Sequence, residues 1–432
     1  MKKLLSFLKL KENSNIREVL INGVSTFSFK IVSLVLAYAL LLLITNKFGA
    51  SVFGRYSITI TLAQLVVMLF TLGLPSAIVK LTSNTINFNS IPQNNYLTKS
   101  VLLTLLSGVL TTIILYLSSE FLAVTVFKDV QLTYYFELLS LFIIPLVLHE
   151  LLSNFFRGKK DFTKYNLFTF IVPYVLFFVS FFIMIKYVSR EEITFLSYGV
   201  GILITFIIEF VLYSKINTRT KINFSTKKLL KLSLPMMFST ALLFLLNWTD
   251  IFMLGSMKSS TEVGVYNAAF KIASLGFIII IAINVVIAPK ISELYSQHKM
   301  EDLKKVIHQS TWLIIVLTIP LVLLIILFRK QVLGLFGSEF LSGEMSLIII
   351  SFGVLISAIS GNVDQILNMT DSHKILRNIT LFCFIINVIL NYVLIPIYGI
   401  NGAAIASLVT NIVLNAICLF YIKKKLGFLT FI

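Results

Sequence analysis

The stretch VGVYNAAFKIASLGFIIIIAINVVIAPK, residues Val263–Lys290, is long and apolar enough to cross a bilayer as one helix, which takes about 20 apolar residues. It also carries Lys271, nine residues after Glu262. At about 1.5 Å per residue, this lysine lies roughly 13 Å into a hydrocarbon core about 30 Å thick. A charge at that depth is costly unless it faces a partner or a water-filled cavity, so we interpret Lys271 as functional. The simpler interpretation is a lysine whose long side chain reaches the membrane surface.

The whole chain has the composition of a membrane protein. Of its 432 residues, 57% are hydrophobic, and its mean hydropathy is +0.94. Soluble domains of this length carry far more polar surface, so the sequence predicts an all-α polytopic membrane protein. The basic N-terminal MKKLLSFLKLK lacks the pattern of a signal peptide and is expected to lie at the membrane surface. Cys383 and Cys418 lie in apolar runs, where we expect core packing rather than a disulfide or a metal site.

Twelve apolar runs are predicted to span the membrane. They lie near residues 19–45, 57–79, 100–119, 136–156, 165–187, 193–213, 232–256, 264–288, 310–328, 344–368, 376–397 and 401–422. Of the 36 lysines and arginines, 26 fall on the side of the termini, 8 on the opposite side, and Lys30 and Lys271 within spans. The positive-inside rule then places both termini in the cytoplasm. This asymmetry accounts for most of the net charge of +17 without a nucleic-acid partner.

The two sets of six runs share sequence pieces at a constant offset of 210 residues. FGRY at 53–56 corresponds to VGVY at 263–266, Asp161 to Asp371, and Lys164 to Lys374. We therefore predict two parallel copies of a six-helix unit related by an axis along the membrane normal. The predicted parts are an N-terminal lobe (1–215), a basic cytoplasmic linker (216–231) and a C-terminal lobe (232–432).

Polar residues recur at helical spacing inside several predicted spans, which indicates the face that looks inward. The stripes are Asn22, Thr26, Lys30 and Ser33; Thr240, Asn247 and Asp250; Asn267, Lys271 and Ser274; Ser357, Gly361, Asp364 and Asn368; and Ser407, Asn411 and Asn415. Hydrogen bonding between helices explains the Ser, Thr and Asn members at least as well as a cavity does. For the charged members we favour function, against the alternative that Lys271 pairs with Asp250 or Asp364 to lock helices.

No motif for catalysis or ATP hydrolysis is present in the sequence, and we expect no enzyme activity. His149 and Glu150 lie near the cytoplasmic end of the fourth predicted span, and Glu209 near that of the sixth. We expect these three side chains to reach the membrane surface or to meet basic loops.

The motifs, in order, are TNKFGASVFGRYS, LKLSLPMMFS with Asp250 downstream, VGVYNAAFKIA, APKISELY and NVILNYVLIPIYGINGAAIAS. Over nearly the whole chain, this pattern resembles the polysaccharide-transporter branch of the MOP exporter superfamily, the Wzx-type oligosaccharide flippases. The resemblance implies twelve helices in two six-helix lobes, arranged as a V around a central cavity lined by helices one, two, seven and eight. It implies movement of an undecaprenyl-diphosphate-linked oligosaccharide, of the O-antigen or capsule kind, from the cytoplasmic to the outer leaflet.

On these lining helices, the mid-span cations suit an anionic headgroup. A diphosphate carries about two negative charges, and its desolvation needs cations or hydrogen-bond donors. We hypothesise that Lys30 and Lys271 receive it, with Arg55 secondary and with Asn22 and Asn267 from the same polar stripes.

The resemblance also implies coupling to a Na⁺ or H⁺ gradient. Asp250, Asn387, Asn391 and Ser407 fall where a related flippase family places a Na⁺ site, and oxygen ligands suit a hard cation. Asn391 departs from the pattern, because a carboxylate there would add charge. Hydrogen bonding between amides is the equal alternative, and Asp250 or Asp364 would remain as proton carriers. No other cofactor is expected.

Two other functions remain open at this point. One is a MATE-like multidrug efflux pump coupled to cations, although amphiphilic cations prefer an acidic, aromatic pocket. The other is a non-transporting scaffold of an envelope-assembly complex, for which mid-membrane charges are unnecessary. For the flippase, we expect a monomer in the bacterial inner (plasma) membrane that works with a polymerase and other glycan-assembly proteins.

Overall fold

The computed structural model describes residues 14–87, 94–187, 190–216 and 225–431. The basic segment 1–13, predicted to lie at the membrane surface, is outside the described residues. Within the described ranges, every regular element is a helix. This confirms the all-α prediction for the part of the chain that the structure covers.

The first half of the chain forms α2 (Ser14–Phe70), α3 (Leu74–Asn87), α4 (Asn94–Glu120), α5 (Leu132–Gly158), α6 (Phe162–Asn166), α7 (Val172–Met184) and α8 (Ile193–Ile216). The second half forms α9 (Thr226–Met257), α10 (Ser260–Ala273), α11 (Phe277–Ser296), α12 (Met300–Leu327), α13 (Arg329–Gly334), α14 (Glu344–Ser360), α15 (Val363–Met369), α16 (His373–Tyr398) and α17 (Ile400–Leu426). Short π or 3₁₀ turns lie at Phe121–Val126, Leu167–Ile171, Ser274–Gly276 and Ser338–Gly343. Residues 226–231, predicted to belong to the linker, form the first turns of α9.

The helix α2 is broken at Gly49, which has φ 80° and ψ −176°. A positive φ is easy for glycine and strained for other residues, so the chain turns here without a loop. The predicted spans 19–45 and 57–79 therefore meet at one residue. The apolar part of α2, Ser25–Phe70, has 46 residues, roughly 70 Å if straight, against a hydrocarbon core of about 30 Å.

Among the described residues, ten helices are long and apolar enough to cross a membrane. The number is eleven if α9, whose parts 226–242 and 244–257 are bent by 51°, forms one span. Ser25–Phe70 counts as a single helix in both numbers. The chain is a multi-pass membrane protein, with large apolar side chains exposed along α4, α12 and α16 where lipid would contact them.

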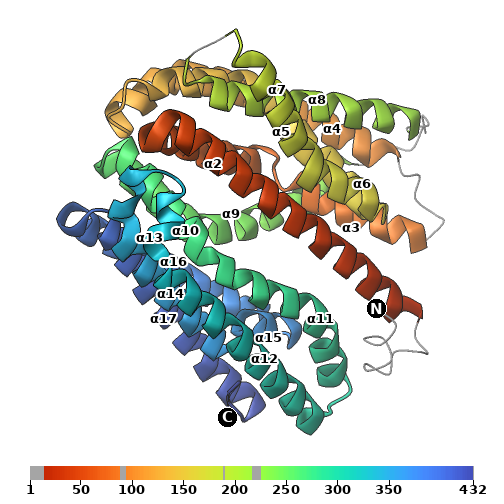
Figure 1. Cartoon of the computed structure of the whole chain (residues 1–432). Coiled ribbons are helices and arrows are strands. Elements are labelled where there is room, and N and C mark those ends of the chain that lie inside the picture. Colours follow the sequence, from red (N-terminus) through yellow and green to blue (C-terminus); the bar gives the residue numbers. More distant parts are fainter. Residues whose placement is uncertain (1–13, 88–93, 188–189, 217–224, 432) are drawn as a thin grey trace.

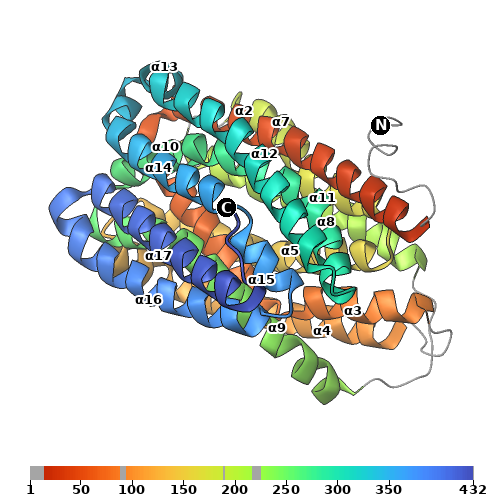
Figure 2. The same ribbon diagram turned by 90° about the horizontal axis from the view of Figure 1, so that it is seen from below.

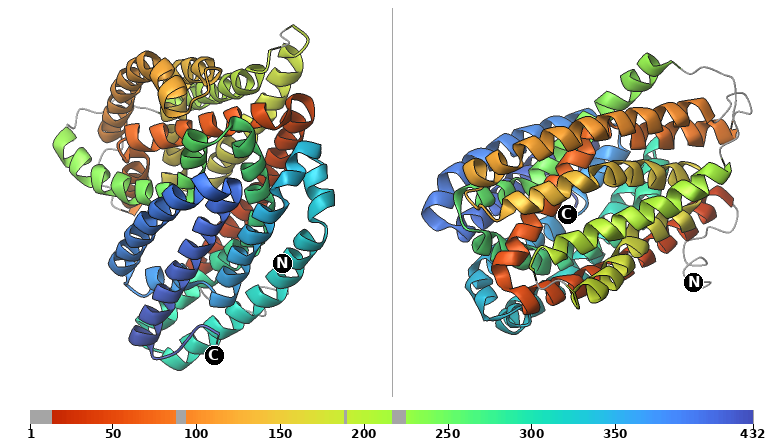
Figure 3. Two further views of the ribbon diagram at one scale, coloured as in Figure 1. Left: turned by 90° about the vertical axis from the view of Figure 1, so that its left-hand side faces the viewer. Right: turned by 90° about the horizontal axis from the view of Figure 1, so that it is seen from above.

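Helices of the same half pack together, and α2 and α10 connect the halves. In Figure 1, α3–α8 lie across the upper part of the picture and α12–α17 lie in the lower part. From below, α16 and α17 run side by side (Figure 2), and they pack extensively on each other. The long helices follow a roughly common direction (Figure 3). Between the halves, α2 packs on α10, and both α2 and α3 pack on α9.

The predicted repeat extends to the helix bounds. Shifted by 210 residues, the end of α8 at Ile216 coincides with the end of α17 at Leu426. The first residue after the Gly49 break, Ala50, coincides in the same way with the start of α10 at Ser260. Both cysteines are free, and both are buried, in agreement with the predicted core packing.

Candidate functional site

Two glycines bring α2 and α10 into backbone contact. A Cβ atom added to Gly54 would lie 1.7 Å from the carbonyl oxygen of Ser260, and one added to Gly264 would lie 2.1 Å from that of Ala50. At the 210-residue offset, Gly54 corresponds to Gly264 and Ala50 to Ser260, so the contact is symmetric. Small residues four positions apart let two helices approach this closely. We call this the outer contact, after the side of the membrane predicted for it.

Two acidic side chains cross the outer contact in the same symmetric way. Oδ2 of Asp129 accepts a hydrogen bond from the Ser260 hydroxyl at 2.6 Å. Oε2 of Glu339 accepts one from the backbone N–H of Ala50 at 2.9 Å. Asp129 corresponds to Glu339 at the same offset. Each half thus holds the first residue of the other half's helix with a carboxylate, which also interacts favourably with the helix dipole.

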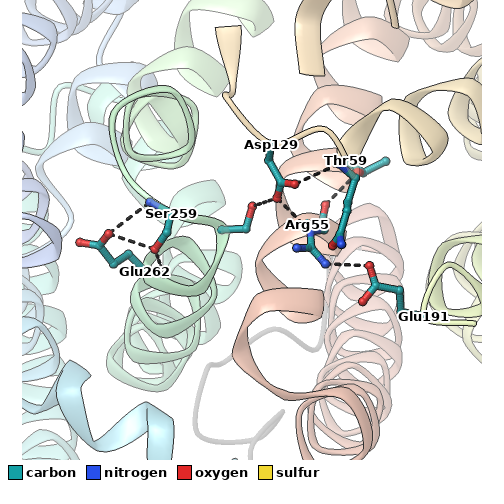
Figure 4. Close-up of polar contacts among 8 residues, drawn as sticks. Arg55, Thr59, Asp129, Glu191, Ser259 and Glu262 are labelled. Carbon is teal, nitrogen blue, oxygen red and sulfur yellow. Dashed lines mark hydrogen bonds and ion pairs between the residues drawn. The ribbon is translucent and has the colours of Figure 1, made fainter. Parts of the chain in front are cut away.

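Arg55 belongs to this charged region (Figure 4). Its Nε lies 2.9 Å from Oδ2 of Asp129, and its Nη1 lies 2.7 Å from Oε1 of Glu191. Arg55 was predicted as a secondary diphosphate ligand, but two carboxylates occupy its guanidinium and it lines neither of the cavities described below. Ser259 is the N-cap residue of α10 and forms a capping box with Glu262. These residues belong to connections that were predicted on the non-cytoplasmic side, and the structure places them in contact with one another.

Asp129 lies between the candidate spans, at the edge of the outer contact. Its burial alone would raise the pKa of the carboxyl group. Hydrogen bonds from Ser260 and Arg55, together with the Arg55 charge, outweigh burial and hold the pKa of Asp129 below its ordinary value. The charged form of Asp129 therefore stabilises the outer contact.

A second site is a buried polar cluster around Asp250, which is 4% exposed. Asp250 accepts hydrogen bonds from the Tyr266 hydroxyl at 2.6 Å and from Asn391 Nδ2 at 2.7 Å, and it also accepts one from Ser407. Asn391 Nδ2 also lies 3.0 Å from Oδ1 of Asn387. Four of the five residues predicted for ion coupling therefore meet in one place.

The donor set of this cluster fits a small hard cation. One carboxylate, amide oxygens and hydroxyls converge, and Oδ1 of Asn391 is buried without a hydrogen-bond partner. An amide places either its oxygen or its nitrogen toward a neighbour by rotating, so the same side chain can serve a carboxylate or a cation. No group of three or more His, Cys, Asp or Glu side chains that could hold a metal occurs among the described residues.

Two members of the cluster were not predicted. Tyr266 belongs to the repeated VGVY piece, and its hydroxyl contacts Asp250. Thr410 lies three residues after Ser407, on a stripe that the sequence did show, and it accepts from Asn387 at 3.5 Å. The spacing from Ser407 would have identified Thr410, whereas the approach of Tyr266 to Asp250 depends on how α9 and α10 pack.

Lys271 lies on a cavity of about 140 Å³ between α2 and the junction of α10 with α11. Leu34, Tyr38 and Leu41 of α2 form the opposite wall, and the Tyr38 hydroxyl donates to the Lys271 carbonyl at 2.5 Å. In the part of the chain that the structure describes, the Lys271 ammonium has neither a hydrogen bond nor an ion pair. The ion pair of Lys271 with Asp250 or Asp364, left open above, does not form.

The remaining predicted residues are placed as follows. Lys30 is exposed on α2, one helical turn before Leu34 and on the same face. Asn267 is buried one turn before Lys271, and its Oδ1 has no hydrogen-bond partner. Asp364 is exposed on α15 and is not part of the Asp250 cluster. The side chain of Asn22 is outside the described residues.

His149 and Glu209 form a buried pair that the sequence did not predict. His149 Nδ1 lies 2.9 Å from Glu209 Oε2, and the Ser153 hydroxyl donates to Glu209 Oε1 at 2.7 Å. Glu209 is 0% exposed, so the expectation that it reaches the membrane surface or a basic loop is wrong. The contact between α5 and α8 creates this pair. A histidine and a glutamate at similar depth were the only signal in the sequence.

Two family models match the chain. The model described as polysaccharide biosynthesis protein matches residues 19–295, and the model described as MatE matches residues 235–393. A curated relative from Haloferax volcanii, a "probable low-salt glycan biosynthesis flippase", is 28% identical over 174 residues. That match covers 39% of this chain and 37% of the relative, so the chain spans well under two thirds of the relative's length.

Two solved structures share the fold. An inward-facing multidrug resistance MATE transporter of the MOP superfamily has a TM-score of 0.76 at 15% identity, over 91% of this chain and 94% of that chain. The lipid II flippase MurJ, in an inward closed conformation, has a TM-score of 0.76 at 16% identity, over 94% of this chain and 87% of that chain.

Proposed function

The chain belongs to the polysaccharide biosynthesis protein family, as its resemblance to Wzx-type flippases indicated, and we propose that it moves a lipid-linked glycan across a membrane. The names of the relative from Haloferax volcanii and of MurJ support this class of cargo. The proposed cargo is an undecaprenyl-diphosphate-linked oligosaccharide that passes from the cytoplasmic to the outer leaflet of a bacterial plasma membrane. The protein acts as a transporter rather than an enzyme, as a monomer beside a polymerase and other glycan-assembly proteins.

The proposed architecture has twelve spans in two lobes. Counting Ser25–Phe70 as two spans that meet at Gly49, and α9 as one, gives this number. The helix bounds that recur at the 210-residue offset support two six-helix units, one before residue 216 and one after the linker. Both termini lie in the cytoplasm in this arrangement, and the lobes form a V that closes at the outer contact.

The single observation that carries the proposal is the unpaired Lys271 ammonium beside a cavity between α2 and α10. A partly buried cation without a counter-ion is costly, and an anionic ligand removes that cost. Lys271 would bind the diphosphate, and Lys30, on the cavity-facing side of α2, would receive it from the cytoplasmic side. Arg55 is left out because its charge is already neutralised by Asp129 and Glu191.

Asp250, Asn387, Asn391 and Ser407 would hold the coupling ion, Na⁺ or H⁺, whose gradient supplies the energy. Tyr266 links this cluster to α10, the helix that also carries Lys271 and Gly264. Any change in the hydrogen bonds of Asp250 therefore acts on the helix that forms the outer contact. Opening of that contact would expose the cargo to the outer leaflet.

One observation favours a second candidate, efflux of amphiphilic cations. A larger cavity in the first half contains the Glu150 carboxylate together with Tyr174, Tyr198 and Phe244. Aromatic rings and a carboxylate attract organic cations. The family membership and the Lys271 cavity weigh toward a glycan carrier.

The test is complementation of a strain that lacks its glycan flippase, with accumulation of lipid-linked sugar as the readout. Wild-type protein should restore export, and Lys271→Ala should abolish it while the protein stays in the membrane. Lys290→Ala is the matched control, because it removes an exposed lysine that pairs with Glu293 of its own helix at 2.9 Å and lines neither cavity. Export by Lys271→Ala at the wild-type rate would overturn the headgroup site, and failure of the wild type would overturn the function.

A further inference from the structure

A cavity of about 510 Å³, which we call the first-half cavity, is lined mainly by residues of the first half. This volume is within the range of about 300–1,000 Å³ usual for small-molecule sites. Its walls come from α2, α3, α5, α7 and α8, with Thr240 and Phe244 of α9 on one side. The cavity therefore touches both halves.

Its polar lining is rich in hydroxyl and amide groups rather than in charges. Gln64, Thr71, Thr169, Tyr174 and Tyr198 line it, and the Thr169 hydroxyl is buried without a hydrogen-bond partner. Hydroxyls and amides both donate and accept, as the hydroxyls of a sugar do. The rings of Tyr174, Tyr198 and Phe244 add flat apolar surface beside these groups.

The charge of the cavity excludes a diphosphate. Glu150 and His149 line it, and His149 is paired with Glu209 directly behind it. The Glu150 carboxylate accepts from the Asn154 amide, and no cation pairs with it among the described residues. When Glu150 and Glu209 are both ionised, they carry two negative charges, and His149 carries at most one positive charge. The site then has no net positive charge.

The two cavities lie against neighbouring residues of α2. Leu40 lines the first-half cavity, and Leu41 lines the cavity of Lys271. One helix thus separates an uncharged-to-acidic compartment from a cationic one. A cargo with a diphosphate and a glycan has two parts that match these two compartments.

We propose that the first-half cavity binds the sugar portion of the cargo, with neutral and amino sugars accepted and uronic acids rejected by Glu150. This assignment rests on the proposed function for the identity of the cargo, but not for the binding test. Sugar hydroxyls or an ammonium group would bond to Glu150, Gln64 and Thr169 while a ring face lies on Tyr198 or Phe244. The diphosphate would stay on the Lys271 side of α2.

Trp248 provides a direct reporter of this cavity. It stacks on Phe244 with ring centroids 6.1 Å apart, and the only other tryptophan in the sequence is the exposed Trp312. In the full chain carrying Trp312→Phe, fluorescence of Trp248 should change on titration with a panel of unlipidated neutral, amino and uronic oligosaccharides of equal length. Neutral and amino members should shift it, and uronic members should not.

Three variants assign the shift to the cavity. Glu150→Gln keeps the shape and should weaken binding of amino sugars about tenfold, the loss expected for one charge-assisted hydrogen bond. Lys271→Ala should leave sugar affinity unchanged while weakening the binding of undecaprenyl diphosphate. Glu293→Gln removes a half-exposed carboxylate that lines neither cavity and should change neither affinity.

Three results would overturn the assignment: no panel member shifts Trp248, uronic members bind as well as neutral ones, or tetraphenylphosphonium binds and displaces the sugars. The last result would favour the cation-efflux function. Failed complementation with intact sugar binding would instead remove the proposed function and keep the cavity assignment.

Discussion

The two halves of the chain are alike where they meet and unlike in their interiors. At the outer contact, Gly54 mirrors Gly264 in sequence offset and in close approach to the other helix, and Asp129 and Glu339 each accept a hydrogen bond from the first residue of the other half's helix. Within each half, the same offset pairs residues of opposite character. Lys271 corresponds to Thr61, so the cation proposed to bind the headgroup has no copy at that position of the first half.

The polar cluster of the second half shows this divergence most clearly. Asp250, Asn387 and Asn391 correspond to Leu40, Phe177 and Phe181 of the first half. Leu40 and Phe177 line the first-half cavity, so positions that bind each other in one half form a cavity wall in the other. In the opposite direction, a polar group of the first half has apolar counterparts in the second half. His149, Ser153 and Glu209 correspond to Ile359, Val363 and Leu419.

The comparison suggests a division of tasks. A contact that opens and closes between two lobes works best when both lobes present matching surfaces, as in a two-fold interface. Binding of a cargo and binding of a coupling ion need different chemistry, which separate interiors provide. Variants of the interiors test how the halves differ, and variants of the outer contact test how they are alike.

The largest effect is expected in the interior. Glu209→Ala leaves His149 buried without its partner, and removing one member of a buried pair costs about 3–5 kcal/mol of folding free energy. Thermal unfolding in detergent should show the loss. The triple variant His149→Ile, Ser153→Val and Glu209→Leu installs the second-half residues and should recover most of it, because apolar side chains replace the pair. Equal stability of Glu209→Ala and wild type would show that the pair is not a structural link.

The next effect is at the glycines. Gly54→Ala and Gly264→Ala each place a Cβ atom on a backbone carbonyl, so α2 and α10 must separate, at a cost of about 1–3 kcal/mol. The rate of disulfide formation between Asn46→Cys and Leu335→Cys, whose native residues are hydrogen-bonded at 3.0 Å across the halves, measures the closed contact. It should fall similarly in both variants. Gly334→Ala, with open space at its Cβ, is the control. A drop in only one variant would refute the symmetry.

The sequence predicted the features that the two halves share better than the contacts inside each half. The repeat was visible in the sequence in a few residues, FGRY and VGVY, and the structure shows it again in helix bounds that recur at the same offset. Four of the residues predicted for ion coupling came from the resemblance and meet around Asp250, whereas Asp364, predicted from a polar stripe, lies elsewhere. Pairs between helices that are distant in sequence, such as Arg55 with Asp129, depend on packing angles that spacing along one helix does not encode.

The acidic side chains of the outer contact should have effects no larger than those of the glycines, and unequal to each other. Asp129→Asn removes the charge that holds Arg55 and Ser260, at a cost of about 1–3 kcal/mol for partly buried groups. Glu339→Gln weakens one bond of an exposed side chain, worth about 0.5–1.5 kcal/mol. The same disulfide assay should therefore slow more in Asp129→Asn. A larger effect of Glu339→Gln would mean that the first-half helix start controls closure.

The smallest effect is the pH dependence of closure. Because the pKa of Asp129 in the folded protein lies below the ordinary value of 3.8, its stabilising contribution is fully present above that value and is lost as the pH falls through the lower folded pKa. Cross-linking of the same cysteine pair, in an acid-compatible version of the assay, should stay constant from neutral pH to about pH 4.5 and decline only below the ordinary carboxyl range. Asp129→Asn should remove the part of the decline that belongs to this carboxyl group.

A decline in wild type between pH 7 and 5 that Asp129→Asn abolishes would place the folded pKa above the ordinary value and would contradict a charged Asp129 at the outer contact. A decline in that range that persists in Asp129→Asn would point to another titrating group.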